Sequence, residues 1–413
     1  RGILKILYFI GRTKSGADMA ESVSKAKKRS IIAAGIILAL IILAVVLYFT
    51  GAYEALIIKL GILQEEEITP QGTFFEYIPK GVADMAFLDG NVLIADESGV
   101  SCFNQDGDWL WSKELSLTSP VLVNAGSKVL AADIGGTGVH CFDKNGFLWT
   151  YIAEDTITGI SENCRNGKFL VIHKFSGYLS AATLLDVAAE GKALASRKFG
   201  ECYAVSASFT EDGSRLAITG IGPETGNISN IFTFMKTDNY DVYSTETVSD
   251  AFFPAVSFVK GDSLFAAGGD SLRRLVKKDS TGSSEDKNDI LWDREGGAQE
   301  LVAVCTVPGK YFITVSALAG ADADMEASCE VSIYESNGEK SKNFSVAGGI
   351  EGVAFSGKTL ACYTKNELYV YNISGQLIGK FDSVSQITDI EFISERVLAV
   401  CGAAKMAKVD FRK

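Results

Sequence analysis

Few residues of this 413-residue chain combine the right type and spacing for catalysis or metal binding. Its eight cysteines stand singly, without a C-x-x-C pair or the spacing of zinc ligands. They are Cys102, Cys141, Cys164, Cys202, Cys305, Cys329, Cys362 and Cys401. Most lie in apolar stretches, where cysteine acts as a small core hydrophobe. We expect unpaired core cysteines, with one or two disulfides as the alternative.

The chain has only two histidines, His140 and His173. A Ser-His-Asp relay, a histidine general base or a histidine-rich metal site would have to be built around one of them. Because the two histidines fall in separate strands, a structural role is the simpler interpretation for both.

A third candidate is the stretch "NQDGD" at residues 104–108, which is similar to the start of a calcium loop. Such a loop needs an acidic ligand at its twelfth position, where this chain has Leu115. We therefore interpret the stretch as a hairpin turn. Together, these patterns predict no catalytic residues, no metal site and no cofactor, so we expect a protein that is not an enzyme.

The same region contains the clearest repeat in the sequence. "CFNQDGDWLW" (Cys102–Trp111) is followed by "CFDKNGFLWT" (Cys141–Thr150), and each reads as a strand, a tight glycine-containing turn and a returning strand. A hairpin that recurs after about 40 residues is typical of helical arrays or of propeller blades. Abundant glycine and short alternating runs of Val, Ile, Phe and Tyr favour β structure.

Residues 82–413 divide into eight such units, each with a second strand of the pattern x-Leu-apolar-apolar. The second residues of these strands are Leu93, Leu130, Leu170, Leu216, Leu264, Phe312, Leu360 and Leu398. The intervals suit four short strands per unit, which predicts an all-β, eight-bladed β-propeller. An up-and-down β-barrel is the alternative fold. The eighth unit ends after its third strand, and the strand Thr73–Lys80 could complete it, giving a propeller over residues 72–413.

A membrane anchor is predicted ahead of the propeller. Residues 31–52 carry no charge and would span roughly 33 Å as one transmembrane helix. A buried core helix and a cleavable signal peptide are the alternatives. Lys25, Lys27, Lys28 and Arg29 precede this segment, and an acidic run, Glu65–Glu67, follows it. By the positive-inside rule, residues 1–30 are a cytoplasmic basic tail, residues 53–71 are a linker, and the propeller lies outside the cell membrane.

The charge distribution argues against one class of partner. The formal net charge is −12, although residues 1–30 alone carry eight basic and two acidic side chains. The rest of the chain is therefore strongly acidic and would repel the phosphates of a nucleic acid. We expect no nucleic-acid partner.

The turn and strand pattern resembles exported propellers of the pyrroloquinoline-quinone repeat type, in which a Trp follows the turn glycine by four residues. "FNQDGDWLW" has this spacing with Gly107 and Trp111, whereas Trp149 comes one place early. The plan of basic tail, membrane span and eight-unit propeller also resembles an uncharacterised family of membrane-anchored propellers from Gram-positive anaerobes. That resemblance implies a fold and a location, and no activity.

These observations predict a single-pass, membrane-anchored scaffold that binds another protein of the cell envelope. The alternative is an enzyme or receptor that binds a quinone or a sugar at the propeller mouth. Extended loops on a rigid scaffold are common binding sites, and units four and six have the longest second-to-third-strand connections. Their acidic residues form the predicted binding rim: Glu224, Asp322, Asp324 and Glu326.

Overall fold

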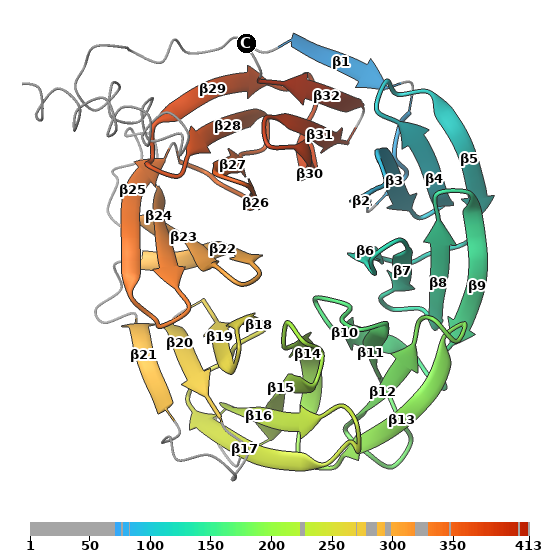
Figure 1. The fold of residues 1–413 in the computed structure, drawn as a ribbon, viewed down its shortest axis with the longest axis vertical. Helices are drawn as coiled ribbons and strands as arrows, with labels where there is room; N and C mark the ends of the chain where they lie inside the picture. The colour runs from blue at the N-terminus through green and yellow to red at the C-terminus, as the bar shows by residue number, and fades with distance from the viewer. Residues whose placement is uncertain are drawn as a thin grey trace, which may run out of the picture. The chain divides into compact units, whose positions relative to one another are not determined.

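The eight apolar second strands of the sequence repeat lie in eight separate β-sheets. The computed structural model describes residues 71–411, apart from residues 76, 82, 224–227, 270, 278–286, 294–298, 319–328, 347 and 404. Within these residues, each sheet has four antiparallel strands, and the sheets follow one another around a ring (Figure 1). The fold is an eight-bladed β-propeller, as the repeat predicts, and the single barrel is excluded.

The first four blades use consecutive strands, which follow one another from the centre of the ring outward. Blade 1 contains β2 (Asp84–Leu88), β3 (Asn91–Asp96), β4 (Gly99–Asn104) and β5 (Trp109–Glu114). Blade 2 contains β6 (Pro120–Asn124), β7 (Val129–Asp133), β8 (Gly138–Asp143) and β9 (Gly146–Ile152). Blade 3 contains β10 (Ile157–Ile160), β11 (Lys168–His173), β12 (Ser180–Asp186) and β13 (Lys192–Phe199). Blade 4 contains β14 (Tyr203–Phe209), β15 (Arg215–Pro223), β16 (Ile228–Lys236) and β17 (Val242–Ser249).

The remaining blades follow the same order, except for the outermost strand of the last one. Blade 5 contains β18 (Ala255–Lys260), β19 (Ser263–Ala267), β20 (Ser271–Val276) and β21 (Lys287–Asp293). Blade 6 contains β22 (Gln299–Val307), β23 (Tyr311–Leu318), β24 (Cys329–Glu335) and β25 (Lys340–Val346). Blade 7 contains β26 (Gly352–Ser356), β27 (Thr359–Tyr363), β28 (Glu367–Asn372) and β29 (Leu377–Asp382). Blade 8 contains β30 (Ile387–Ser394), β31 (Val397–Gly402), β32 (Met406–Asp410) and β1 (Gln71–Phe75).

Burial changes from the middle of each blade to its outer edge. Every residue of β7 and of β31 is buried, whereas nearly every residue of β5 is exposed. A second strand is covered on both faces because its blade packs between two neighbours, which explains its continuous apolar sequence. The core is therefore a set of apolar layers between blades.

The ring is closed by strands from the two ends of the propeller. β1 pairs antiparallel with β32, with Thr73 opposite Lys408. The closing strand thus begins at Gln71 and ends at Phe75, whereas the sequence predicts Thr73–Lys80. Residues 77–80 leave blade 8 instead, because the Tyr77 hydroxyl and the Lys80 amide both donate to Asp96 at the end of β3, at 2.7 and 2.9 Å.

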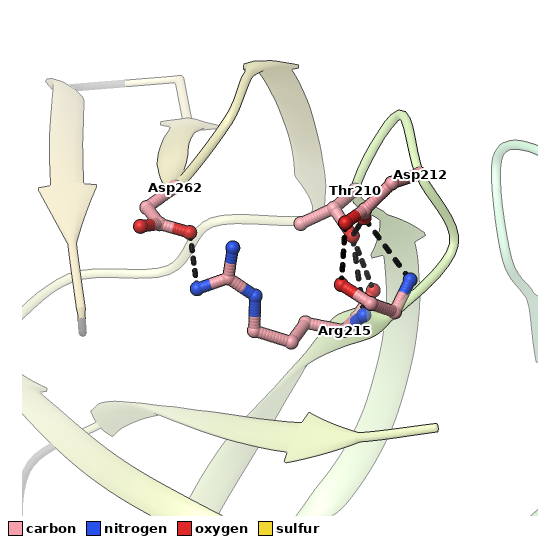
Figure 2. A network of polar contacts seen from close by, with 5 residues as sticks. Thr210, Asp212, Arg215 and Asp262 are labelled. Atoms are coloured by element: carbon pink, nitrogen blue, oxygen red, sulfur yellow. Dashed lines mark hydrogen bonds and ion pairs between the residues drawn. The ribbon is translucent and has the colours of Figure 1, made fainter. Parts of the chain in front are cut away.

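Polar contacts at a hairpin turn help to join blades 4 and 5 (Figure 2). In the turn before β15, Asp212 accepts hydrogen bonds from the Thr210 hydroxyl at 2.6 Å and the Ser214 hydroxyl at 2.7 Å. These bonds, with the Thr210 bond first, hold the pKa of Asp212 at about 2. Arg215, which follows the turn, forms an ion pair with Asp262 in the β18–β19 turn of the next blade.

The predicted membrane anchor lies outside the described residues, as do Lys25, Lys27, Lys28 and Arg29. The described part of residues 71–411 contains no helix of the length and apolarity that a membrane crossing requires.

Removal of β1 tests the closure. A chain that starts at residue 77 should be less stable than one that starts at residue 67 by roughly 3–5 kcal/mol, taking about 1 kcal/mol for each lost ladder hydrogen bond. It should also self-associate, because the edge of β32 becomes available for pairing. Thermal unfolding and analytical ultracentrifugation measure both effects. Equal melting temperatures and equally monomeric chains would show that β1 does not close the ring.

Candidate functional site

The predicted acidic rim lies outside the described residues: Glu224, Asp322, Asp324 and Glu326. The structure does correct the expected loop of unit four. Most of the stretch "GIGPETGNIS" lies in strands, since β15 continues to Pro223 and β16 begins at Ile228. The extra length of this unit therefore extends a hairpin, and only residues 224–227 connect the two strands.

The cysteines and histidines have structural surroundings. All eight cysteines lie in the described part of the chain, and none forms a disulfide. Burial raises the pKa of Cys102 to about 12, so this thiol stays protonated and unreactive. His173 is fully buried and contacts the Thr183 hydroxyl at 2.9 Å and the Lys174 carbonyl at 2.8 Å. His140 contacts the Thr150 hydroxyl at 2.9 Å, and the pair links two neighbouring strands.

The stretch "NQDGD" forms a hairpin turn, as predicted. The Asn104 side-chain oxygen accepts hydrogen bonds from the backbone amides of Asp106 and Asp108, both at 2.9 Å. Gly107 has a φ of 89°, a left-handed conformation that suits glycine. The side chain that would bind calcium is thus used by the turn itself.

A cavity of about 380 Å³ lies where the innermost strands converge. Its lining comes from six blades and includes Met85, Glu162, Ser257, Cys305 and Glu391. In Figure 1 the strands that supply these residues, or that directly precede them, lie nearest the centre of the ring. The cavity is the central channel of the propeller, and its most unusual feature is its acidity.

Two of the acidic side chains form a pair between the first and last blades. Asp84 of β2 accepts hydrogen bonds from the Met85 amide at 2.8 Å and the Leu122 amide at 2.7 Å. Asp389 of β30 accepts a longer bond from the Met85 amide, at 3.2 Å, and its carboxyl group is also hydrogen-bonded to Asp84. Burial, followed by the charge of Asp84, raises the pKa of Asp389 well above its usual range. We infer that Asp389 holds the shared proton and donates it to Asp84.

Glu162, which follows β10, joins three blades on another side of the channel. Its side chain lines the cavity and is exposed to it. Its carboxylate accepts hydrogen bonds from the Ser208 hydroxyl of blade 4 at 2.7 Å and the Ser257 hydroxyl of blade 5 at 2.6 Å. Removal from bulk water raises the pKa of Glu162 to about 7 even though the two hydroxyls oppose the change.

Glu391 of β30 differs from these acids because no hydrogen-bond partner is found for it among the described residues. Burial, followed by the charge of Asp84, raises its pKa to about 7. Near neutral pH the channel therefore contains carboxyl groups that are only partly ionised. Such groups can bind a cation or exchange protons with a bound molecule.

The channel is poorly suited to an acidic quinone cofactor. Four carboxyl groups, those of Asp84, Glu162, Asp389 and Glu391, lie on or next to its wall, and Arg165 is the only basic residue of the described lining. Pyrroloquinoline quinone is itself a carboxylic acid, so the ionised fraction of these groups would repel it. Within the described residues, no three Cys, His, Asp or Glu side chains are grouped as metal ligands.

Sequence reasoning missed these acids, although it contained a signal for them. Three sequence stretches that overlap the innermost strands β2, β10 and β30 contain these acids: "VADMAF" has Asp84, "ITGISE" has Glu162, and "ITDIEF" has Asp389 and Glu391. An acid is uncommon in an apolar strand, and in a propeller the innermost strand borders the axis. The convergence of these side chains follows from the closed ring.

A second candidate is the outer apolar surface, formed by Trp109, Leu110, Phe147, Leu148 and Ile152. These residues belong to β5 and β9, which contact each other along the outer rim (Figure 1). Trp109 is 60% exposed and Ile152 is 62% exposed. Exposed apolar side chains gathered on neighbouring elements commonly mark a protein-binding surface.

The fold and channel define this protein as an eight-bladed β-propeller with an acidic axis and an apolar outer surface on two blades. Residues 79–411 match a family of unknown function, DUF5711, and the chain belongs to that family. No curated protein matches the sequence.

Several solved structures share the fold. BamB from Moraxella catarrhalis is 15% identical with a TM-score of 0.52, over 82% of this chain and 98% of BamB. The quinohemoprotein alcohol dehydrogenase ADHIIG from Pseudomonas putida HK5 is 10% identical with a TM-score of 0.55, over 82% of this chain and 75% of the dehydrogenase. The quinohemoprotein alcohol dehydrogenase from Comamonas testosteroni gives the same identity and TM-score, over 83% and 76% of the two chains. At these identities the likeness concerns the fold alone.

The charge of Glu391 should make the stability of the propeller depend on pH. Its pKa is higher in the folded state than in the unfolded state, so folding is weakened as the pH rises from about 4.5 to about 7. Glu391→Gln should therefore stabilise the protein at pH 8 by about 1–2 kcal/mol, because one pKa unit is worth about 1.4 kcal/mol and water in the cavity weakens the effect.

Chemical unfolding at pH 8 and pH 4.5 measures this effect. The advantage of Glu391→Gln should nearly disappear at pH 4.5, where the carboxyl is protonated in the folded state and about half protonated in the unfolded state. Glu339→Gln, in an exposed turn, is the matched control and should change stability little at either pH. If Glu391→Gln is no more stable than the unaltered protein at pH 8, the charge of Glu391 does not destabilise the folded state.

Proposed function

We propose that this chain is a single-pass membrane protein whose extracytoplasmic propeller binds another protein of the cell envelope and catalyses no reaction. Residues 31–52 would form the anchor, with residues 1–30 in the cytoplasm. The uncharged segment and the basic side chains before it support this orientation. The propeller then acts as a rigid scaffold that is attached to the membrane.

The outer apolar surface is the observation that carries the proposal. Tryptophan and other aromatic residues contribute strongly to protein interfaces because they bury a large area with little loss of side-chain entropy. Trp109 lies on this surface with more than half of its area exposed, next to the partly exposed Leu110. A partner with a complementary apolar surface would remove these side chains from water.

Other outermost strands provide an internal comparison. The strand β25, "KSKNFSV", and β17, "VYSTETVS", mostly expose Lys, Ser, Thr, Asn and Glu. Lysine and other charged residues on an edge strand oppose unwanted pairing with other chains. The strands β5 and β9 instead have Trp, Leu, Phe and Ile at many of their exposed positions, where a charged residue would oppose pairing. This difference favours a specific contact between blades 1 and 2 and a partner protein.

The alternative is an enzyme or receptor that binds a quinone or a sugar at the propeller mouth, and its quinone-binding form has less support. Its cofactor would meet the carboxyl groups of the central channel, and the cysteines of the described residues are unpaired and mostly buried. A protein-binding role requires neither feature.

In-cell crosslinking tests the scaffold role. The full chain should crosslink to a specific envelope protein, and the double variant Trp109→Ser/Ile152→Ser should reduce its recovery at least about tenfold, since loss of two interface anchors costs more than about 1.4 kcal/mol. Lys342→Ala, on the exposed surface of β25, is the matched control and should leave recovery unchanged. Equal recovery by the double variant, or no crosslinked protein at all, would contradict the proposal.

Protease accessibility tests the membrane topology. In intact cells stripped of their wall, an added protease should degrade the propeller and spare an epitope placed before Lys25. Permeabilised cells provide the control in which both are degraded. Protection of the propeller in intact cells would show that the orientation is wrong.

A further inference from the structure

A tryptophan that packs between blades is replaced by alanine in blade 3. In blade 1, Leu93 pairs with Cys102, which pairs with Trp111. In blade 2 the same positions are Leu130, Cys141 and Trp149. In blade 3 they are Leu170, Leu184 and Ala195. Strand pairing thus aligns Ala195 with the two tryptophans of the sequence repeat.

The two tryptophans fill the space between their own blade and the next. The ring of Trp111 stacks on Phe142 of blade 2, with ring centroids 5.7 Å apart, and its indole N–H donates to the Lys144 carbonyl at 3.0 Å. Trp149 is only 8% exposed and lies against Gly191 of blade 3, where an added Cβ would come within 2.6 Å of the indole ring. An indole at this position therefore closes the gap between adjacent blades.

Blade 3 has a cavity of about 410 Å³ in the corresponding place. Its apolar wall comes from the facing surfaces of two blades, and Ser196 and Tyr240 add hydroxyl groups to the lining. Blade 3 contributes Leu170, Ala182, Leu184 and Ala195, and blade 4 contributes Leu216, Ile218 and Met235. Most of these residues are otherwise buried in one apolar cluster. The space is large enough for a small molecule, given the usual size of ligand pockets.

Arg197 supplies a positive charge to this apolar cavity. It is paired in register with Ala182 on β12, lies two residues after Ala195 on the same face of β13, and lines the cavity. Its Nε atom is buried without a hydrogen-bond partner, and no carboxylate of the described residues is paired with the guanidinium. The guanidinium lies over the Phe199 ring, 5.6 Å from the ring centroid, and this cation–π contact leaves its positive charge without an anion.

Two further lining residues, Tyr178 and Lys198, are suited to contact a ligand at the opening of the cavity. Tyr178 is 48% exposed, and the Lys198 ammonium lies over its ring at 5.5 Å and over that of Phe175 at 3.9 Å. Among the described residues, Lys198 has no carboxylate partner either. In a chain with a net charge of −12, two basic side chains without acidic partners at one cavity favour an anionic ligand.

We propose that the cavity between blades 3 and 4 binds an amphipathic carboxylate. Its apolar body occupies the space that an indole fills in blades 1 and 2, and its carboxylate accepts hydrogen bonds from Arg197. An arginine holds a carboxylate in a two-point, charge-assisted contact, which a neutral or cationic head group cannot form. The proposal goes beyond the scaffold function and uses no residue of the outer apolar surface, so the two can fail separately.

Octanoate is a suitable probe, with octan-1-ol and octylammonium as matched head-group controls. Calorimetric unfolding of the full chain in lipid nanodiscs should show that octanoate raises the melting temperature in a saturable manner. Octylammonium should have no such effect, and octan-1-ol should bind at least about tenfold more weakly. Equal stabilisation by octylammonium and octanoate would overturn the proposal, because it would show non-specific partitioning.

Two variants locate the site. Ala195→Trp restores the residue of blades 1 and 2 and should abolish the octanoate response by filling the cavity. Arg197→Gln should weaken octanoate binding at least about tenfold and leave octan-1-ol binding unchanged, whereas Lys192→Gln, at an exposed position of β13, should change neither. An unchanged octanoate response in Arg197→Gln, or in a folded Ala195→Trp protein, would place the ligand elsewhere. If Ala195→Trp does not fold, the comparison of Arg197→Gln with Lys192→Gln decides the question.

Discussion

The face-to-face packing of blades is the constraint on which the rest of this structure depends. A four-stranded blade buries both faces only when it has a neighbour on each side, so the ring must close. The pairing of β1 with β32 completes the last blade, and Asp84 and Asp389 meet at the same joint between blades 8 and 1. Closure also brings the innermost strands together, which concentrates acids from distant parts of the sequence around one axis.

Three features depart from what packing alone would select. The channel contains carboxyl groups whose pKa values are raised by their surroundings, β5 and β9 expose apolar residues on the outer rim, and an alanine leaves a cavity where two other blades have tryptophan. Each of these features lowers either the stability of the isolated propeller or its solubility. Conflicts of this kind between local sequence and global stability are typical of functional sites.

The fold was predictable because the second strand of each blade is buried on both faces and reads as an uninterrupted apolar run. The residue at which the closing strand ends was not predictable from the sequence. Its position depends on hydrogen bonds from Tyr77 and Lys80 to Asp96, and the sequence repeat does not relate these residues to one another. The length of unit four predicts an enlarged loop, whereas most of its extra residues extend β15 and β16. The acidic channel needs the closed ring, and the cavity at Ala195 needs the strand register, so neither follows from a local pattern.

We propose that the propeller is a protein-binding scaffold that uses the outer surface of blades 1 and 2. Hydrogen–deuterium exchange of the full chain, alone and in complex with its crosslinked envelope partner, tests it most directly. The account predicts that binding slows exchange in β5 and β9 and in the turns that precede them, with little change in the other outermost strands. Protection confined to the central channel, or to the outer strands of other blades, would contradict the account.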